Sequence, residues 1–205
     1  MGSLQSILLM GPTGSGKTPL GKFCEANGVR EKKCAHFDFG KNLRRIADNG
    51  FESSLLTKND LTVVKESLKT GSLLENENFH IARKILQGFI EETNFKVSDL
   101  LLLNGMPRHI GQANDMDGLV EMVMVLCLKC SPEVIHERIK NNSGGDRVQR
   151  IDDSVEEIER KIKIFDERTL PLLDYYRRKG VMVEVKEVAV STTAEEMHKW
   201  LSVFR

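Results

Sequence analysis

The residues best suited to chemistry lie near the N-terminus, where positions 11 to 18 form the pattern G-x-x-x-x-G-K-[ST]. A glycine-rich turn with this spacing lets backbone N–H groups converge on phosphate oxygens, which bulky side chains would prevent. An apolar run precedes the turn and a helix-like stretch follows it, so the positive end of a helix would also face the anion. We therefore expect a phosphate-binding loop made of Gly11, Pro12, Thr13, Gly14, Ser15, Gly16, Lys17 and Thr18.

Two side chains of this loop have expected roles of their own. The Lys17 amino group would reach the β- and γ-phosphates of a nucleoside triphosphate. The Thr18 hydroxyl would be presented to a Mg²⁺ ion that the same phosphates hold. The loop thus predicts ATP as a ligand and Mg²⁺ as its cofactor.

Composition restricts the other functions that the chain can have. Its 205 residues are enough for one domain with a full hydrophobic core, which we expect to span 1–205. Thirty basic residues balance thirty acidic ones, so no overall field attracts nucleic acid or a membrane surface. No apolar run approaches a membrane span, and no leader pattern opens the chain, so we expect a cytoplasmic protein with reduced thiols.

The positioning elements can be inferred from apolar runs at 6–10, 34–39, 100–103, 123–128 and 181–185. Helical stretches separate these runs, and strands that alternate with helices indicate a parallel α/β sheet. The unbroken apolarity of 100–103 and 123–128 is typical of strands buried on both faces. We predict a central parallel sheet of about five strands with helices on both faces.

Capping signals predict where several helices begin and end. Ser131 precedes Pro132, which suits an N-cap followed by proline at the first helical position. Ser154 and Thr193 each stand three residues before a glutamate, the pattern of a capping box. Pro171 should break or kink the helix that follows Ser154.

Further motifs resemble those of the adenylate kinases, within the nucleoside monophosphate kinase family of P-loop kinases. Asn104-Gly-Met-Pro-Arg108 with Gln112-Ala113 is similar to the signature D-G-[FY]-P-R-x-x-x-Q-A. The other matches are His36 to Arg44 with H-[IL]-S-T-G-D-x-L-R, Gly71 to Leu74 with G-x-L-V, Glu137 to Ile139 with E-R-[LI], Arg150 to Asp153 with R-x-D-D, and Thr169 to Tyr176 with T-x-P-L-[IL]-x-Y-Y. Because these motifs stand in family order, the resemblance covers nearly the whole chain.

The resemblance implies a role for each matching position. It implies a helical acceptor-binding segment at 40–75, a short lid at 139–150, and a monomer that closes around its substrates. The acceptor monophosphate and its base would be bound by Phe39, Gly40, Arg44, Leu73, Leu74, Gly105, Arg108 and Gln112. Arg138 would lie against the donor adenine, and Arg150 would meet the transferring phosphoryl group. The catalytic residues would be Lys17, Arg108, Arg138, Arg150 and Lys161.

The residue types suit that chemistry independently of the resemblance. Two nucleotides placed face to face carry dense negative charge, and a guanidinium group can bind phosphate through two parallel bonds. The acceptor is itself an anionic phosphate oxygen, so no general base is required. Catalysis would then consist of positioning, charge neutralisation and exclusion of water.

Three departures from the family pattern affect the prediction. Asn104 stands where an aspartate organises the water shell of Mg²⁺, so we expect weaker metal binding and, at most, a water-mediated contact. Phe39 and Lys41 stand where a threonine and an acid are usual. In and beyond the lid, Asn142 and Lys161 stand where arginines are usual, and lysine lacks the bidentate fork.

Several functions stay open at this point. The leading one is Mg²⁺-dependent transfer of the ATP γ-phosphoryl group to a nucleoside monophosphate, with AMP favoured by Gln112. A kinase for CMP or UMP is the nearest alternative, and a nucleotide-binding module with little or no turnover is another, because Asn104 and Lys41 replace expected acids. Residues 57–60 resemble the guanine motif [NT]-K-x-D of GTPases, and residues 115–118 match their D-x-x-G motif. The two stand in the reverse of the GTPase order, so Asn59 or Asp60 is better interpreted as a helix cap.

Overall fold

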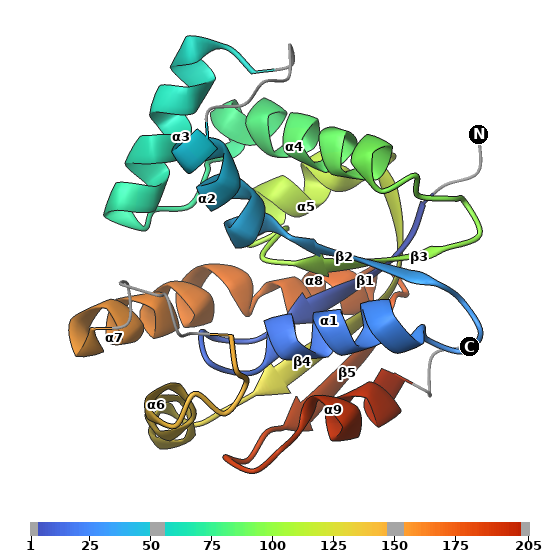
Figure 1. The fold of residues 1–205 in the computed structure, drawn as a ribbon, viewed down its shortest axis with the longest axis vertical. Helices are drawn as coiled ribbons and strands as arrows, with labels where there is room; N and C mark the ends of the chain where they lie inside the picture. The colour runs from blue at the N-terminus through green and yellow to red at the C-terminus, as the bar shows by residue number, and fades with distance from the viewer. Residues whose placement is uncertain (1–3, 50–55, 147–153, 202–205) are drawn as a thin grey trace.

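The computed structural model describes residues 4–49, 56–146 and 154–201, which contain a five-stranded parallel sheet of order β2-β3-β1-β4-β5. The strands are β1 (Leu4–Met10), β2 (Cys34–Asp38), β3 (Leu100–Asn104), β4 (Val120–Lys129) and β5 (Met182–Glu187). Figure 1 shows the strands running side by side through the centre of the molecule, with helices on both sides. The predicted fold class is confirmed.

Burial explains why the central strands read as continuous apolar runs. Every residue of β3 is buried, as are the last five residues of β1 and the 124–128 segment of β4. Each of these strands has a neighbour on both edges and helices on both faces, so apolar side chains point both ways. The prediction of strands buried on both faces is confirmed, although β4 begins three residues earlier than expected.

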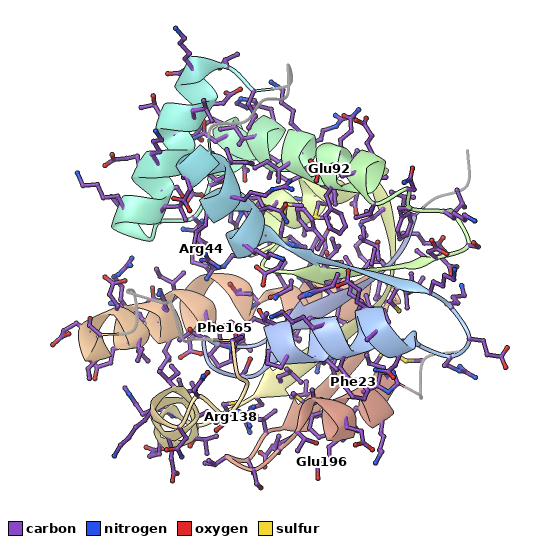
Figure 2. The ribbon with its side chains drawn as sticks, in the orientation of Figure 1. Phe23, Arg44, Glu92, Arg138, Phe165 and Glu196 are labelled. Atoms are coloured by element: carbon purple, nitrogen blue, oxygen red, sulfur yellow. The ribbon has the colours of Figure 1, made fainter. Side chains whose placement is uncertain are left out.

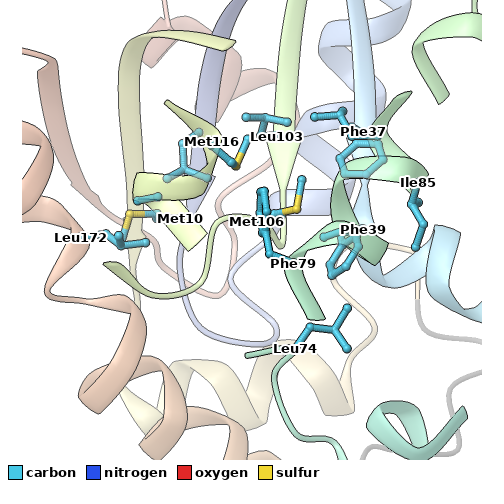
Figure 3. Close-up of a cluster of buried hydrophobic side chains, with 14 of the residues drawn as sticks. Met10, Phe37, Phe39, Leu74, Phe79, Ile85, Leu103, Met106, Met116 and Leu172 are labelled. Carbon is cyan, nitrogen blue, oxygen red and sulfur yellow. The ribbon is translucent and has the colours of Figure 1, made fainter. Parts of the chain in front are cut away.

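Two apolar clusters lie on opposite faces of the sheet. On one face α1 (Lys17–Asn27) and α9 (Ala194–Trp200) cover alternate residues of β1, β3 and β4. The other face is covered by α2 (Phe39–Asn49), α4 (Phe79–Glu92), α5 (Ile110–Met116) and α8 (Leu172–Arg178). Figure 3 shows the second cluster, in which Met10 and Leu103 from the sheet lie with Phe79 and Leu172 from the helices.

The segment expected to bind the acceptor is helical where the structure describes it. It contains α2, α3 (Lys58–Thr70) and the approach to a short 3₁₀ turn, η1 (Asn76–Asn78). The cap of α3 corrects the sequence interpretation, which placed it at Asn59 or Asp60. Thr57 is the N-cap, and it forms a capping box in which Asp60 occupies the third helical position and bonds back to the Thr57 N–H.

The helices of the second half begin at the predicted N-caps, although of the two predicted capping boxes only the one at Thr193 has both of its hydrogen bonds in the described part of the chain. Ser131 caps α6 (Pro132–Lys140), Ser154 caps α7 (Val155–Ile164), and Thr193 forms a full capping box on α9. Beyond α7 the chain continues as a π-helical turn, η2 (Phe165–Thr169), closed by a bond from the Leu170 N–H to the Phe165 carbonyl. Pro171, which has no N–H to donate, follows at once and separates this turn from α8.

The thiols have the structural role expected of small apolar side chains. Cys24 and Cys127 are buried, and burial raises the pKa of Cys24 to about 12 and that of Cys127 to about 11. All four cysteines are free. None of the helices within 4–49, 56–146 and 154–201 has the length and apolarity needed to cross a bilayer.

Candidate active site

A single cleft brings together nearly all the residues that the sequence singled out. It lies at the carboxyl ends of β1, β2 and β3, where parallel α/β sheets place their ligands. Its walls include Gly11, Pro12, Thr13, Gly14, Gly16, Lys17, Thr18, Phe39, Gly40, Arg44, Leu73, Leu74, Asn104, Gly105, Arg108, Gln112, Arg138 and Lys161. Ser15 is fully buried beneath the loop, and Arg150 lies outside the described residues.

The phosphate loop owes its shape to glycines at conformations that other residues avoid. Gly11 has φ 146° and Gly16 has φ 102°, and Gly16 is the N-cap of α1. A Cβ atom at Gly11 would lie 2.6 Å from Ser15 Oγ and 2.7 Å from the Leu128 carbonyl oxygen. The loop therefore has room only for glycine at this position, and its backbone amides start the helix that faces the cleft.

Lys17 is held over the loop by the loop itself. Its Nζ donates to the carbonyl oxygens of Gly11 and Pro12, each at 2.7 Å, and lies 3.4 Å from Ser15 Oγ. These contacts fix the ammonium group beside the backbone amides that would hold a triphosphate.

Oxygen-bearing side chains form a compact group at the base of the cleft. Thr18 Oγ1 donates to Asp38 Oδ2 at 2.8 Å, and Asn104 Nδ2 donates to the same two atoms at 3.1 and 3.2 Å respectively. Hydroxyl and carboxylate oxygens, such as those of Thr18 and Asp38, are the hard donors that Mg²⁺ prefers, directly or through water. The residues present therefore fit the Mg²⁺ ion that accompanies ATP.

Two arginines, one from α2 and one that follows β3, line the cleft. Arg108 follows β3 and lies deep in the cleft, where desolvation lowers the pKa of its guanidinium to about 10, so it stays charged at neutral pH. Arg44 projects from α2 and is more exposed. Neither guanidinium pairs with a carboxylate of residues 4–49, 56–146 or 154–201, which leaves both charges for an anionic ligand.

Gln112 has more protein partners than the sequence suggested. Its Oε1 accepts from the Arg108 N–H at 2.8 Å, and its Nε2 donates to the Leu74 carbonyl at 2.8 Å. A backbone N–H can only donate and a carbonyl can only accept, so these partners fix the orientation of the amide. Gln112 is 1% exposed and links the acceptor-binding segment to the end of β3.

Arg138 is also held by backbone. Its Nη1 donates to the carbonyls of Ala189, Val190 and Thr192 at 2.7, 3.1 and 3.0 Å, and its Nε donates to the Gly14 carbonyl at 3.2 Å. The side chain is 3% exposed and ties α6 to both the phosphate loop and the β5–α9 connection. In Figure 2 it lies on the α6 side of Phe165, whereas Arg44 lies on the α2 side.

Phe39 contributes apolar surface to the acceptor side. It is 5% exposed and packs with Leu74 and Phe79, as Figure 3 shows, while also lining the cleft. Lys41, which stands where an acid is usual, lies in the first turn of α2, and its backbone N–H donates to Asp38 Oδ1 at 2.9 Å. The cleft therefore has an apolar wall where the family pattern has a hydroxyl.

The lid is described only as far as Asp146. Gly144 and Asp146 line the cleft, and a Cβ at Gly144 would lie 2.6 Å from Pro19 Cγ, so this turn packs on the phosphate-loop helix. The remaining lid positions, 147–150, lie outside the described residues.

Thr169 and Asp38 also line the cleft, although neither was among the predicted site residues. Thr169 lines the cleft, and its Oγ1 donates to the Arg108 carbonyl at 2.8 Å. Asp38 lines it beside Thr18. The sequence indicates Asp38 only as an acid at the end of a predicted strand, where the carboxyl edge of the sheet lies. Thr169 is indicated by its place two residues before Pro171 in the T-x-P-L motif.

Comparison with known proteins decides the family. A family model described as adenylate kinase matches residues 9–181, which contain the phosphate loop, the acceptor-binding segment and the arginines of the cleft. The chain belongs to the adenylate kinase family. It is accordingly an enzyme of the nucleoside monophosphate kinase class.

Relatives in this family are distant in sequence but similar in length. The chain is 31% identical to an adenylate kinase of Stenotrophomonas maltophilia over 89% of this chain and 90% of that protein. It is 28% identical to the probable UMP-CMP kinase 1 of Arabidopsis thaliana over 96% of this chain and 86% of that protein. An adenylate kinase of Haloarcula marismortui is 26% identical over 83% of each chain.

Proposed function

We propose that this adenylate kinase family member transfers the γ-phosphoryl group of Mg·ATP to AMP, giving two ADP. The observation that carries the proposal is the arrangement of the cleft. The phosphate loop with Lys17 lies at one end, and at the other lie Arg44 and Arg108, which pair with no carboxylate of the described residues. A site with one anion-binding end suits a hydrolase or a switch, whereas two such ends facing one another suit transfer between two phosphates.

The chain's own residues account for the reaction without a general base. The AMP phosphate is largely dianionic at neutral pH, so its oxygen can attack the γ-phosphorus directly. A new bond forms between the AMP phosphate oxygen and the γ-phosphorus. At the same time the bond from the γ-phosphorus to the β–γ bridging oxygen breaks, and ADP leaves. Lys17 and Arg108 neutralise the charge spread over the transferring group, and Mg²⁺, when bound with ATP, supplies further neutralisation of the phosphate oxygens.

We assign the donor nucleoside to the Arg138 side of the cleft. Backbone carbonyls accept from Nε and Nη1 of that guanidinium and so fix the orientation of its plane, while Nη2 lies on the Gly16 side. A guanidinium face suits stacking on a purine ring. Lys161 lines the cleft from α7 and would add charge near the phosphates, as would Arg150.

AMP is proposed as acceptor because Gln112 retains one amide proton and one oxygen lone pair beyond its two backbone bonds. Adenine offers both a donor and an acceptor at its base-pairing edge. The competing candidate is a CMP or UMP acceptor, which the apolar Phe39 wall and the similarity to a UMP-CMP kinase favour.

The test is to incubate the protein with ATP and Mg²⁺ together with AMP, CMP, UMP or GMP, and to quantify diphosphates by chromatography. Rapid ADP formation that depends on AMP supports the proposal. Diphosphate formed chiefly from CMP or UMP transfers the assignment to that acceptor. ATP binding without any acceptor-dependent turnover would leave a nucleotide-binding module instead.

An arginine variant tests the acceptor end separately. Arg108→Lys keeps the charge and loses the bidentate fork, so we expect kcat/KM for the acceptor to fall by about 10²-fold. Arg83→Lys, on the exposed side of α4 and away from the cleft, is the matched control and should change kcat/KM little. Equal rates for the two variants would remove Arg108 from the catalytic set.

A further inference from the structure

We propose that Asp38, at the end of β2, is the carboxylate that holds the hydrated Mg²⁺ ion of the bound nucleotide, in place of the acid expected at position 104. The proposal rests on the proposed use of Mg·ATP. It places the metal-binding charge of this chain on a different strand from the one that the sequence motif indicates.

The strand register brings the relevant residues together. Asp38 on β2 is the direct partner of Asn104 on β3, and Asn104 is the direct partner of Leu9 on β1, one residue from the strand's end. The three strands therefore finish at the same edge of the sheet, beside the start of α1. Thr18, in the first turn of α1, bonds to the Asp38 carboxylate at 2.8 Å, so the acid lies beside the hydroxyl expected to face Mg²⁺.

The charges around Asp38 are matched to an ionised acid at this position. Asn104 donates its amide to Asp38 Oδ2 at 3.2 Å, and the same nitrogen lies 3.3 Å from His36 Nε2. An aspartate at 104 would set two carboxylates against each other, whereas asparagine stabilises the one at 38.

Asp38 has a second role that must be separated from metal binding. Its Oδ1 accepts from the Lys41 N–H at 2.9 Å, which is the contact of an N-cap on α2. Its Oδ2 faces Thr18 and Asn104 instead. Because asparagine caps helices as well as aspartate does, Asp38→Asn removes the charge and keeps the cap.

The experiment measures metal binding without turnover, by electron paramagnetic resonance of free Mn²⁺ titrated with the protein–ATP complex in the absence of any acceptor. We expect Asp38→Asn to weaken Mn²⁺ binding by about 10-fold or more, toward the affinity of ATP alone. In the double variant Asp38→Asn/Asn104→Asp the charge returns on the neighbouring strand, and Mn²⁺ affinity should recover to within about threefold of the original protein. The single variant keeps the cap but places an amide nitrogen where Oδ2 accepts from Asn104, so a lower Tm is expected, and Mn²⁺ affinity is compared at a temperature where both proteins are folded.

Asp146→Asn is the matched control, since Asp146 is the other carboxylate that lines the cleft in the described residues. It should leave Mn²⁺ affinity within about threefold of the original. The proposal is overturned if Asp38→Asn binds Mn²⁺ normally, if Asp146→Asn is the variant that loses it, or if the original protein adds nothing to the Mn²⁺ affinity of ATP. A protein that binds Mn²⁺ through Asp38 yet phosphorylates no monophosphate would instead contradict only the proposed function.

Discussion

Replacing Arg138 with methionine should destabilise the fold as well as impair ATP binding. The guanidinium is 3% exposed and donates to four backbone carbonyls, three on the β5–α9 connection and one in the phosphate loop. Methionine keeps much of the apolar stem but donates to none of them. We therefore expect a protein that folds, melts at a lower temperature and holds its phosphate loop less firmly.

The size of the effect follows from the contacts. Two nitrogens carry the four bonds, and hydrogen bonds from a charged donor contribute about 1.5–3 kcal/mol each. Some of that loss is offset, because Ala189 and Thr192 lie at the surface and their carbonyls can be hydrated. A net cost of about 2–4 kcal/mol corresponds to about 6–12 °C in Tm for a chain of this size.

The assay is thermal unfolding followed by circular dichroism, together with the KM for ATP. Arg177→Met is the matched control, because Arg177 pairs with Asp174 in an exposed contact three residues apart on α8. Such pairs contribute about 0–1 kcal/mol, so the control should melt within about 2 °C of the original protein. Arg138→Lys should recover part of the loss, since an ammonium group can still donate to the β5–α9 carbonyls.

Equal melting temperatures for Arg138→Met and Arg177→Met would refute this reasoning. A normal Tm combined with a large rise in the KM for ATP would show that the guanidinium serves the nucleotide alone. A lower Tm with an unchanged KM would show that it serves only the fold.

Two further variants test contacts that the sequence did not indicate. Gln112→Leu leaves two backbone groups without their partner, so it should lower the free energy of unfolding by about 2–4 kcal/mol. The control Gln87→Leu, on the exposed side of α4, should change it by less than about 0.5 kcal/mol. Chemical denaturation measures both values. The hydrogen bond from the Thr57 N–H, with a smaller contribution from His80, lowers the pKa of Asp60 to about 2. The Asp60 carboxylate therefore stabilises α3 fully above the ordinary carboxyl pKa, and this stabilisation is lost as the pH falls toward 2. The Tm difference between the original protein and Asp60→Ala should therefore be larger at neutral pH than at about pH 3, and an equal difference at both would contradict the shifted pKa.

Local patterns predicted the elements well because their causes are local. Residues 7–10 of β1 and 100–103 of β3 are apolar since both faces of the sheet are covered there. Ser131, Ser154 and Thr193 cap helices through N–H groups only three residues away. The cap of α3 was assigned wrongly because the local pattern there fits more than one starting residue. Thr57 and Asp60 cap each other, and a threonine followed by three polar residues offers several positions for the helix to begin.

The partners of the cleft residues depended on long-range contacts. Arg138 bonds to carbonyls more than 50 residues later in the chain, and Gln112 bonds to Leu74, 38 residues earlier. Neither contact leaves a pattern in the sequence, because a carbonyl group is present at every residue. The motif could indicate that these side chains matter, but not that backbone would occupy much of their hydrogen-bonding capacity.

The sequence by itself determined the phosphate loop, the order of strands and helices, and the family. Each follows from residue types at fixed short spacings, such as the glycines without which the loop after β1 cannot form. Only the tertiary structure decided that Asp38 meets Asn104 and Thr18, since that meeting depends on the parallel pairing of β2 with β3 and on where α1 begins. Strand register is set by the burial of whole faces of the sheet, so the place of the acid at its edge becomes visible only once the sheet is assembled.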